Sequence, residues 1–234
     1  MITLLTFPAG LHEPSLSPFC SKTIHLLNMS GQPWQRKDVS NPSRMPHGKL
    51  PVLQWNNETI ADSHLIQAAL ERAGTDFYAT CAFEDRAKGQ AIMRLIEDWP
   101  YHALVHDRWV HDDGWAIFRA AFFGEMPAVM RAPVGEMIRK SVRRGLERHG
   151  IARCTEAERL ALVERDLSAL AEFLGDRPYV LGDTPTAADA ACLAVLGAIR
   201  NLPMETPLRH RIRSDKRIML YLDRCGQAFT SAYA

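Results

Sequence analysis

The stretch Pro14 to Lys22, PSLSPFCSK, places a serine and a cysteine where a redox pair would stand. A dithiol motif Cys-Pro-Phe-Cys would begin at position 17, but Ser17 stands there and Cys20 is the only cysteine of the stretch. Thiol–disulfide exchange starts with attack by a thiolate, so a serine at the attacking position argues against that chemistry. A serine hydroxyl can instead donate a hydrogen bond to the sulfur of a bound thiol.

Both residues also have plain structural explanations. Ser17 followed by Pro18 is a good helix start, with serine as the N-cap and proline at the first helical position. Cys20 would then lie in the first turn, where the positive end of the helix lowers the pKa of an accessible thiol. A buried, inert Cys20 packed beneath the sheet explains the residue equally well. The sequence leaves open whether Ser17 or Cys20 faces the bound sulfur.

A second candidate lies in GKLPVL, residues 48–53. Proline is unusual just before a strand because it cannot donate to the hydrogen-bond ladder of a sheet. The stretch is similar to thioredoxin-like domains, in which a cis proline at this place leaves the backbone N–H and C=O of the preceding residue, here Leu50, free to pair with an extended peptide. This pattern predicts recognition of a peptide backbone at Leu50.

A third candidate is Ala61-Asp62-Ser63, at the junction of an expected strand and an expected helix. An acid followed by serine at this place caps the first turn of the helix. The functional interpretation is that Ser63 and the helix N–H groups hold a carboxylate, while Asp62 binds an ammonium group. A γ-glutamyl group carries both charges on one carbon, and capping does not exclude its binding.

In the second half, one stripe of a long expected helix would border the substrate pocket in the fold that the resemblance described below implies. Its members are Tyr101, His102, Val105 and Trp109. Packing between the two halves of the chain explains the stripe equally well.

Two further clusters predict no chemistry of their own. His102 and His106 are four residues apart with Asp98 one turn before, but this spacing is common by chance and no His-Glu-x-x-His motif is present, so we predict no metal site. Basic residues gather in 139–148 and 209–217 without interleaved aromatic residues. Such clusters are typical of solvated helix faces rather than of a nucleic-acid surface.

The elements that must position these residues change in kind along the chain. Residues 1–73 alternate short strands and helices, with strands expected at 2–7, 34–39, 52–55 and 59–61 and helices at 18–29 and 63–72. Asn56 and Asn57 fit the tight turn between the last two strands, because asparagine tolerates a positive φ. This order predicts an α/β domain of the thioredoxin-like kind.

From about residue 84 the pattern is helical only. Helices are expected at 87–109, 116–123, 134–149, 155–174, 186–200 and 218–228. The sequence therefore predicts two domains, 1–73 and an all-α domain over 84–234, with residues 74–83 as the linker.

The three N-terminal motifs fall in a fixed order: SPFC at 17–20, GKLPVL at 48–53 and ADSHLI at 61–66. Together they resemble the N-terminal domain of the cytosolic glutathione S-transferase superfamily. The segment LGDTPTAADAACLAVLGAI, 181–199, is similar to a helix of that family with its capping box, in which Thr186 is the cap and Asp189 the N3 residue. SPFCSK with the later GDTPTAADA looks most like the metaxin-like or Fax-like branch. The resemblance covers 1–73 and 170–200 well and is weak over 110–165.

The resemblance implies a glutathione site. Ser17 stands where serine-type transferases place the hydroxyl, and where other members place a reactive cysteine. Leu50, before a proline that is cis in the family, would bind the cysteinyl backbone of glutathione. The residues implied for glutathione binding are Lys49, Leu50, Pro51, Asp62 and Ser63. Lys49 would approach the glycyl carboxylate, and Asp62 with Ser63 the γ-glutamyl end.

The function that the resemblance implies is detoxifying transfer of glutathione, as co-substrate, to a small electrophile by a homodimer. One alternative is a glutathione-dependent thiol–disulfide reductase that uses Cys20. The other is a non-catalytic binding or scaffold protein, as metaxin-like proteins are thought to be. Retention of the ADS and LPV motifs favours glutathione binding over a bare scaffold.

The composition bears on the partners and the cellular compartment that we expect for this protein. The 234-residue chain has 28 Lys+Arg against 27 Asp+Glu and is 47% hydrophobic, as globular proteins are. This balance gives no reason to expect a nucleic-acid partner, and no apolar run approaches the ~18 residues that cross a bilayer. The five cysteines are far apart without a Cys-x-x-Cys pair. We therefore expect a reduced, cytoplasmic protein with no membrane partner.

Overall fold

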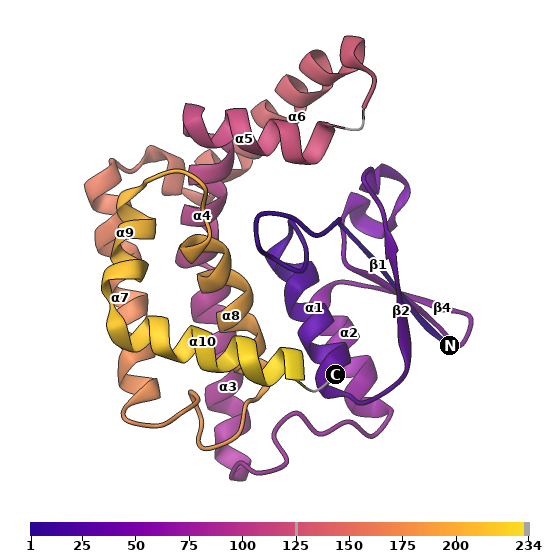
Figure 1. Ribbon diagram of the computed structural model, residues 1–234, viewed down its shortest axis with the longest axis vertical. Helices are drawn as coiled ribbons and strands as arrows, with labels where there is room; N and C mark the ends of the chain where they lie inside the picture. Colours follow the sequence, from indigo (N-terminus) through magenta and orange to yellow (C-terminus); the bar gives the residue numbers. More distant parts are fainter. Residues whose placement is uncertain (125, 232–234) are drawn as a thin grey trace.

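The computed structural model describes residues 1–124 and 126–231, and a small sheet-containing half lies beside a larger helical half (Figure 1). The elements of the first half are β1 (Ile2–Thr6), α1 (Pro18–Met29), β2 (Trp34–Asp38), two 3-10 turns (Pro42–Arg44 and Pro46–Gly48), β3 (Val52–Trp55), β4 (Glu58–Ala61) and α2 (Ser63–Arg72). This is the α/β order that the sequence predicts.

The four strands form one mixed sheet in the order β2-β1-β3-β4. β2 runs parallel to β1, whereas β3 is antiparallel to both β1 and β4. The central strands bury apolar residues on both faces: the pair Leu4 of β1 and Leu53 of β3 is buried on one face, and the neighbouring pair Leu5 and Val52 on the other. Asn56 and Asn57 adopt positive φ angles of 50° and 64° in the β3–β4 turn, as expected.

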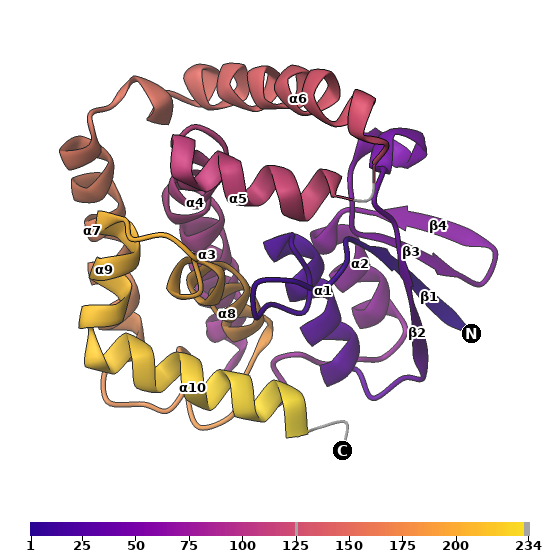
Figure 2. The ribbon, with the colours of Figure 1, turned by 45° about the horizontal axis from the view of Figure 1, so that its top comes forward.

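The second half contains helices only among its described residues. They are α3 (Phe83–Glu97), α4 (Trp99–Trp109), α5 (Asp112–Phe123), α6 (Ala128–His149), a 3-10 turn (Ile151–Arg153), α7 (Glu156–Leu174), α8 (Ala187–Arg200), α9 (Pro207–Ser214) and α10 (Lys216–Ser231). α8 is buried on all sides, as its Ala- and Leu-rich sequence requires, and it contacts α1, α3, α4, α9 and α10. Figure 2 shows α1 and α2 between the sheet and these helices.

The predicted capping box of α8 is confirmed. Asp189 accepts hydrogen bonds from the Thr186 N–H and hydroxyl, both 2.8 Å long. The other carboxylate oxygen accepts from the Val180 N–H at 3.0 Å and from the Tyr221 hydroxyl at 2.9 Å. Asp189 therefore joins the start of α8 to the preceding loop and to α10.

The prediction of a single helix over 87–109 is wrong. The structure has two helices, separated at Asp98, whose φ of −100° and ψ of −104° are not helical. Pro100 explains the break, because proline has no N–H to donate and its ring collides with the carbonyl one turn earlier. A further helix, α9 (Pro207–Ser214), was not predicted, because its basic residues obscure the apolar positions Leu208 and Ile212.

The division into two domains stays a prediction. No helix or strand occupies residues 74–82, but α3 already begins at Phe83, inside the predicted linker. One continuous hydrophobic core joins the halves and includes Leu4, Ile66, Ile92 and Leu196. Among the described residues, no helix has the length and apolar character needed to span a membrane.

Candidate active site

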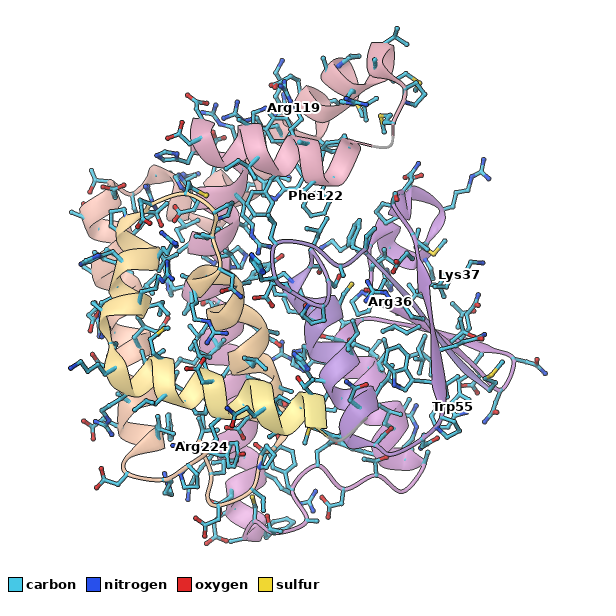
Figure 3. The ribbon with its side chains drawn as sticks, in the orientation of Figure 1. Arg36, Lys37, Trp55, Arg119, Phe122 and Arg224 are labelled. Carbon is cyan, nitrogen blue, oxygen red and sulfur yellow. The ribbon has the colours of Figure 1, made fainter. Side chains whose placement is uncertain are left out.

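A cavity of about 400 Å³ lies between the sheet-containing half and α4, α5 and α6. The N-terminal half contributes Ser17, Lys49 and Leu50 to its wall, and α4 contributes Tyr101, Val105 and Trp109. Phe122 of α5 closes one side, since its ring contacts Phe7 at 5.3 Å and Trp109 at 5.4 Å between centroids. In Figure 3, Phe122 points from α5 toward the sheet-containing half, whereas Arg119 points away from it.

Ser17 lies in the cavity wall at the start of α1. The loop before it is fixed by Ser15, whose hydroxyl donates to the Phe7 carbonyl at 3.0 Å and accepts from the Ser17 N–H at 3.3 Å. Ser17 occupies the N-cap position and Pro18 begins the helix, as predicted, but the Ser17 side chain makes no capping hydrogen bond. Its hydroxyl is therefore not committed to the helix backbone.

Cys20 is fully buried in a small core cluster with Leu5, Leu50 and Val52, and it does not line the cavity. Burial raises the pKa of the Cys20 thiol, and the nearby hydroxyls of Thr6 and Ser17 offset this only in part. Both facts oppose thiolate formation and access. The structure thus favours the buried, inert interpretation of Cys20.

Lys49 and Leu50 line the same side of the cavity as Ser17, and Pro51 follows them outside its lining. The Leu50–Pro51 peptide bond is cis. Leu50 precedes the first paired residue of β3, Val52, so its backbone lies outside the β1–β3 ladder. Lys49 is exposed at the mouth of the cavity, where its ammonium group can meet a carboxylate.

Asp62 and Ser63 lie outside this cavity, where β4 ends and α2 begins. Asp62 has φ 84° and ψ 134°, a region that disfavours a residue with a Cβ, and such strain clusters at functional sites. Its carboxylate accepts a 2.8 Å hydrogen bond from the His64 N–H, so it does cap α2. The Ser63 hydroxyl, 1% exposed, has no hydrogen-bond partner among the described residues. An orphaned hydroxyl at a helix N-terminus fits the carboxylate of a γ-glutamyl group.

Sequence reasoning missed a buried charge cluster next to this turn. The Lys22 ammonium contacts one Glu97 oxygen at 2.6 Å, and His64 Nε2 contacts the other at 2.5 Å. Burial lowers the pKa of Lys22, and Glu97 offsets part of that effect. Burial also opposes ionisation of Glu97, but His64 and Lys22 outweigh it and lower the pKa of that carboxyl. A lysine among the apolar residues of α1 was the available signal.

His102 differs from the other three residues of the predicted stripe, because it does not line the cavity. Its ring stacks on His149 of α6, with centroids 3.9 Å apart, and its Nδ1 lies 2.8 Å from the Asp98 carbonyl oxygen. A helical residue one position after Tyr101 points to a different side of the helix, which explains the separation.

Asp98, His102 and His149 place possible metal-ligand atoms within 4.8 Å of one another. His149 Nε2 is already 2.8 Å from an Asp98 carboxylate oxygen, and stacked rings direct their nitrogen lone pairs side by side rather than to one point. We assign this cluster to packing of α6 on the α3–α4 junction. His106, considered with His102 in the sequence, lies outside the cluster.

Arg108 is a second residue that the sequence analysis missed. Its side chain lines the cavity although the residue is only 5% exposed, and one guanidinium nitrogen donates to the Leu16 carbonyl at 3.0 Å. The guanidinium also lies 4.7 Å from the Phe118 ring centroid. Burial lowers the pKa of Arg108 to about 10, so it stays charged at neutral pH. The available sequence signal was its position seven residues after Tyr101, because residues two helical turns apart lie on the same face of a helix.

Models of known protein families match both halves of the chain. The model of the glutathione S-transferase N-terminal domain matches residues 18–114, and that of the glutathione S-transferase C-terminal domain matches residues 163–225. The chain belongs to the glutathione S-transferase superfamily. Within this superfamily, the described α/β half followed by helices is the fold of its structural relatives.

Curated relatives of this superfamily member fall into two groups. The isoprene-epoxide–glutathione S-transferase of Rhodococcus sp. (strain AD45) is 26% identical over 236 residues, 98% of this chain and 99% of the relative. Failed axon connections of Drosophila melanogaster is 26% identical and metaxin-1 of Homo sapiens 24% identical, each over 84% of this chain. The chain spans 50% and 44% of those two relatives. These last matches support the metaxin-like or Fax-like branch.

Solved structures of other superfamily members show the same fold. Glutathione transferase GSTFuA3 of Phanerochaete chrysosporium superposes with a TM-score of 0.66 at 19% identity, covering 100% of this chain and 97% of the other. A glutathione S-transferase of Ceriporiopsis subvermispora in complex with glutathione gives 0.64 at 17% identity, covering 100% and 98%. At these identities the likeness concerns the fold alone.

Proposed function

We propose that this protein is a glutathione transferase that conjugates the glutathione thiolate to a small, mostly apolar electrophile. The observation that carries the proposal is the cavity between the halves. It brings Ser17, Lys49 and Leu50 to one wall and the rings of Tyr101 and Trp109 to the other. A thiol held at the first wall would face an acceptor held at the second.

Ser17 is the proposed donor to the glutathione sulfur. A free thiol has a pKa of about 8.5, so only a few per cent is thiolate at neutral pH. A hydroxyl and the N–H groups at the start of α1 would lower that pKa, and each unit is worth about 1.4 kcal/mol. The thiolate attacks the acceptor directly, and Ser17 forms no covalent bond. The Ser17 hydroxyl makes no capping hydrogen bond to α1, which supports this role.

The remaining polar groups fit the rest of glutathione. The Leu50 backbone would pair with the cysteinyl residue, and Lys49 would meet the glycyl carboxylate. Ser63 and the first N–H groups of α2 would hold the γ-glutamyl carboxylate, and Asp62 the ammonium group beside it. The orphaned Ser63 hydroxyl supports this placement.

The name of the Rhodococcus relative, which aligns with nearly all of this chain, also supports an enzymatic role. Failed axon connections and metaxin-1 favour the second candidate, a non-catalytic binding or scaffold protein. The buried Cys20 gives no support to the third, a thiol–disulfide reductase.

Calorimetric titration of glutathione and turnover of an aryl halide separate these functions. We expect millimolar or tighter binding by the wild type, weaker binding by Asp62→Ala, and a loss of turnover of about 100-fold in Ser17→Ala. Cys20→Ala should keep its turnover. No binding of glutathione by the wild type would support the scaffold, and loss of activity in Cys20→Ala alone would support the reductase.

The same proposal includes the compartment, the oligomeric state and the role of the protein: a cytoplasmic homodimer that acts in detoxification. The five cysteines are all free, which supports a reducing compartment. Analytical ultracentrifugation of the purified protein should give a mass of twice 26.3 kDa. A single species at the monomer mass would refute the dimer.

A further inference from the structure

The outward face of α6 carries one continuous row of exposed side chains. Positions 130, 133, 137, 140, 144 and 148 follow one another at intervals of three or four residues, which places them on one face of the helix, and all of them are exposed. The first half of this outer row is apolar and the second half is basic: Met130, Pro133 and Met137, then Lys140, Arg144 and Arg148. Figure 2 shows α6 at the outer edge of the molecule, beside α5.

The three cations of the outer row are not used by the fold. Among the described residues, none forms an ion pair or a hydrogen bond with their side chains. The arginines on the inner side of the same helix are committed instead. Arg131 donates to the carbonyls of Gly124 and Met126 at 2.7 and 3.0 Å, and Arg139 donates to the Asp112 carboxylate at 2.7 Å. The outer cations are therefore available to an anionic partner.

Few acids oppose these cations. α6 contains two, of which Glu136 accepts from the Trp115 indole N–H at 2.9 Å and Glu147 is exposed beside the outer row. Arg143, which is also exposed, adds a further positive charge. This surface is therefore positive although the net charge of the whole chain is only +1. Such a patch attracts an anionic surface before contact is made.

The apolar end of the row is uncovered as well. Val129, next to the row, and Met130 and Met137 within it are 85%, 49% and 63% exposed. A single exposed apolar side chain needs no explanation, but several together at one end of a helix mark a contact with a partner. That partner must offer apolar material and negative charge within the length of one helix.

We propose that the outer row of α6 binds the surface of an anionic lipid bilayer. Val129, Met130 and Met137 enter the boundary between the headgroups and the acyl chains, and the three cations meet the lipid phosphates and carboxylates. Long basic side chains suit this arrangement, because their stems lie along apolar surface while their charged ends stay in the polar layer.

Other anionic partners fit the row less well. A nucleic acid would neutralise the cations but leave the apolar residues in water, because its outer surface is phosphate. An acidic protein would need a groove of its own to enclose the projecting methionines. A bilayer offers both kinds of contact in one plane, and binding to it requires no helix that spans the membrane. The sequence predicted a solvated face and no membrane partner because the cations were considered without their apolar neighbours.

The same helix forms one wall of the cavity. Val134, Ile138 and Val142 line it from a side of α6 adjacent to the outer row. Because a helix with its side chains is about 10–12 Å across, the bilayer surface would lie about that far from the cavity. Apolar molecules dissolved in the bilayer would then be near the place where the acceptor is proposed to bind. The membrane contact itself does not depend on the proposed transferase function.

Sedimentation with lipid vesicles tests the proposal on the full chain. The wild type should bind vesicles of equal parts phosphatidylserine and phosphatidylcholine, should not bind vesicles of phosphatidylcholine alone, and should release the anionic vesicles as salt is added. No binding to the anionic vesicles, or equal binding to both kinds, would overturn the proposal.

Two variants separate the halves of the row. The charge variant replaces its three cations with glutamine: Lys140→Gln, Arg144→Gln and Arg148→Gln. Its partition coefficient for anionic vesicles should fall about 100-fold, since each cation near such a surface contributes roughly fivefold. The apolar variant, Met130→Ser with Met137→Ser, should lose about tenfold, because less apolar area is buried.

A matched control removes three exposed cations outside α6: Arg72→Gln, Arg213→Gln and Lys216→Gln. It should bind within about threefold of the wild type, because charges far from the contact are screened. All the replaced side chains are exposed, so the thermal unfolding of each variant should match that of the wild type.

Several outcomes would overturn the outer row as a membrane site. A control that loses as much binding as the charge variant would show attraction to net charge alone, and an apolar variant that binds as tightly as the wild type would show that no apolar residue enters the bilayer. Binding of soluble polyglutamate but not of anionic vesicles would assign the row to an acidic protein. A shift from dimer to monomer in the apolar variant would assign it to a second copy of the chain.

Discussion

Single buried polar groups decide much of the energetics of this protein, because each is either satisfied within the chain or available to a ligand. Ser21 and Ser63 are both fully buried, yet the Ser21 hydroxyl donates to the Ser15 carbonyl at 3.3 Å whereas the Ser63 hydroxyl has no described partner. Burial of an unpaired hydroxyl costs free energy, so Ser63 fits a ligand better than it fits the empty fold.

This contrast predicts opposite effects of the same substitution. Ser63→Ala should leave the thermal midpoint unchanged or raised, because no protein hydrogen bond is lost. It should weaken glutathione binding at least about tenfold, since a hydrogen bond to a charged group is worth about 1.5–3 kcal/mol. Ser21→Ala, the matched control, should lower stability by about 1 kcal/mol. Thermal unfolding and calorimetry measure both effects, and a marked loss of stability in Ser63→Ala would contradict the unpaired state of this hydroxyl.

Glu13 predicts a pH dependence of stability. Burial raises the pKa of Glu13 to about 7, from 4.5, although Asn201, Arg108 and Arg200 oppose the rise. Because the folded state then holds a proton that the unfolded state releases, stability falls as pH rises from 4.5 toward 7. The loss is roughly 3 kcal/mol, at about 1.4 kcal/mol for each pH unit.

Glu13→Gln, which keeps an oxygen to accept from Asn201, should remove this dependence. Urea unfolding at pH 5 and pH 8 measures it: we expect the variant to match the wild type at pH 5 and to exceed its stability at pH 8. Equal pH profiles of the two proteins would show that Glu13 does not titrate in this range.

At the scale of elements, Lys22, His64 and Glu97 join α1, α2 and α3 through two short contacts around one carboxylate. The side chains of Lys22 and Glu97 are 1% and 6% exposed, so neither charge is solvated once its partner is lost. His64 directly follows Ser63, so its contact with Glu97 fixes the position of the first turn of α2. We expect it to position Asp62 and Ser63 rather than to touch a ligand.

Glu97→Gln should destabilise the fold by about 3 kcal/mol at neutral pH, because it leaves the buried Lys22 charge without a counterion. The pKa of Glu97 is lowered, so its stabilisation is present above pH 4.5, the unfolded value, and is lost as pH falls below it. Urea unfolding at pH 7 and pH 3.5 should show a smaller acid loss in the variant. Asp223→Asn, which breaks the exposed pair with Arg200, should cost less than 1 kcal/mol. Equal losses in the two variants would contradict the buried role of Glu97.

At the scale of the whole molecule, one hydrophobic core extends through both halves. Leu4 and Ile66 of the first half belong to the same cluster as Ile92 and Leu196 of the second, and α1 packs directly on α8. Separation of the halves would expose this shared surface, which makes a half-folded state costly.

Scanning calorimetry should therefore show one transition, with the calorimetric and van't Hoff enthalpies equal. Asp189→Ala should shift that single transition downward rather than split it, because Asp189 joins α8 to the preceding loop and to Tyr221 of α10. Two resolved transitions would show that the halves unfold independently and that the shared core does not couple their unfolding.

The sequence by itself determined what depends on local chemistry. Short strand-like runs and the Asn56–Asn57 turn specified the strands, and Thr186 with Asp189 specified the start of α8, because these signals act over a few residues. The same local signals wrongly predicted one helix across α3 and α4. Whether Pro100 ends a helix or only bends it depends on how the chain packs around it.

Tertiary structure decided which side chains meet. Ser17 and Cys20 are three residues apart in one motif, yet one lines the cavity and the other is in the core, because Ser17 precedes α1 as its N-cap whereas Cys20 lies one turn inside the helix, packed against Leu5 and Val52. Lys22, His64 and Glu97 come from distant positions of the chain, and so do Arg108 and Leu16. Burial gives these groups their energetic weight, and burial exists only once the helices have packed.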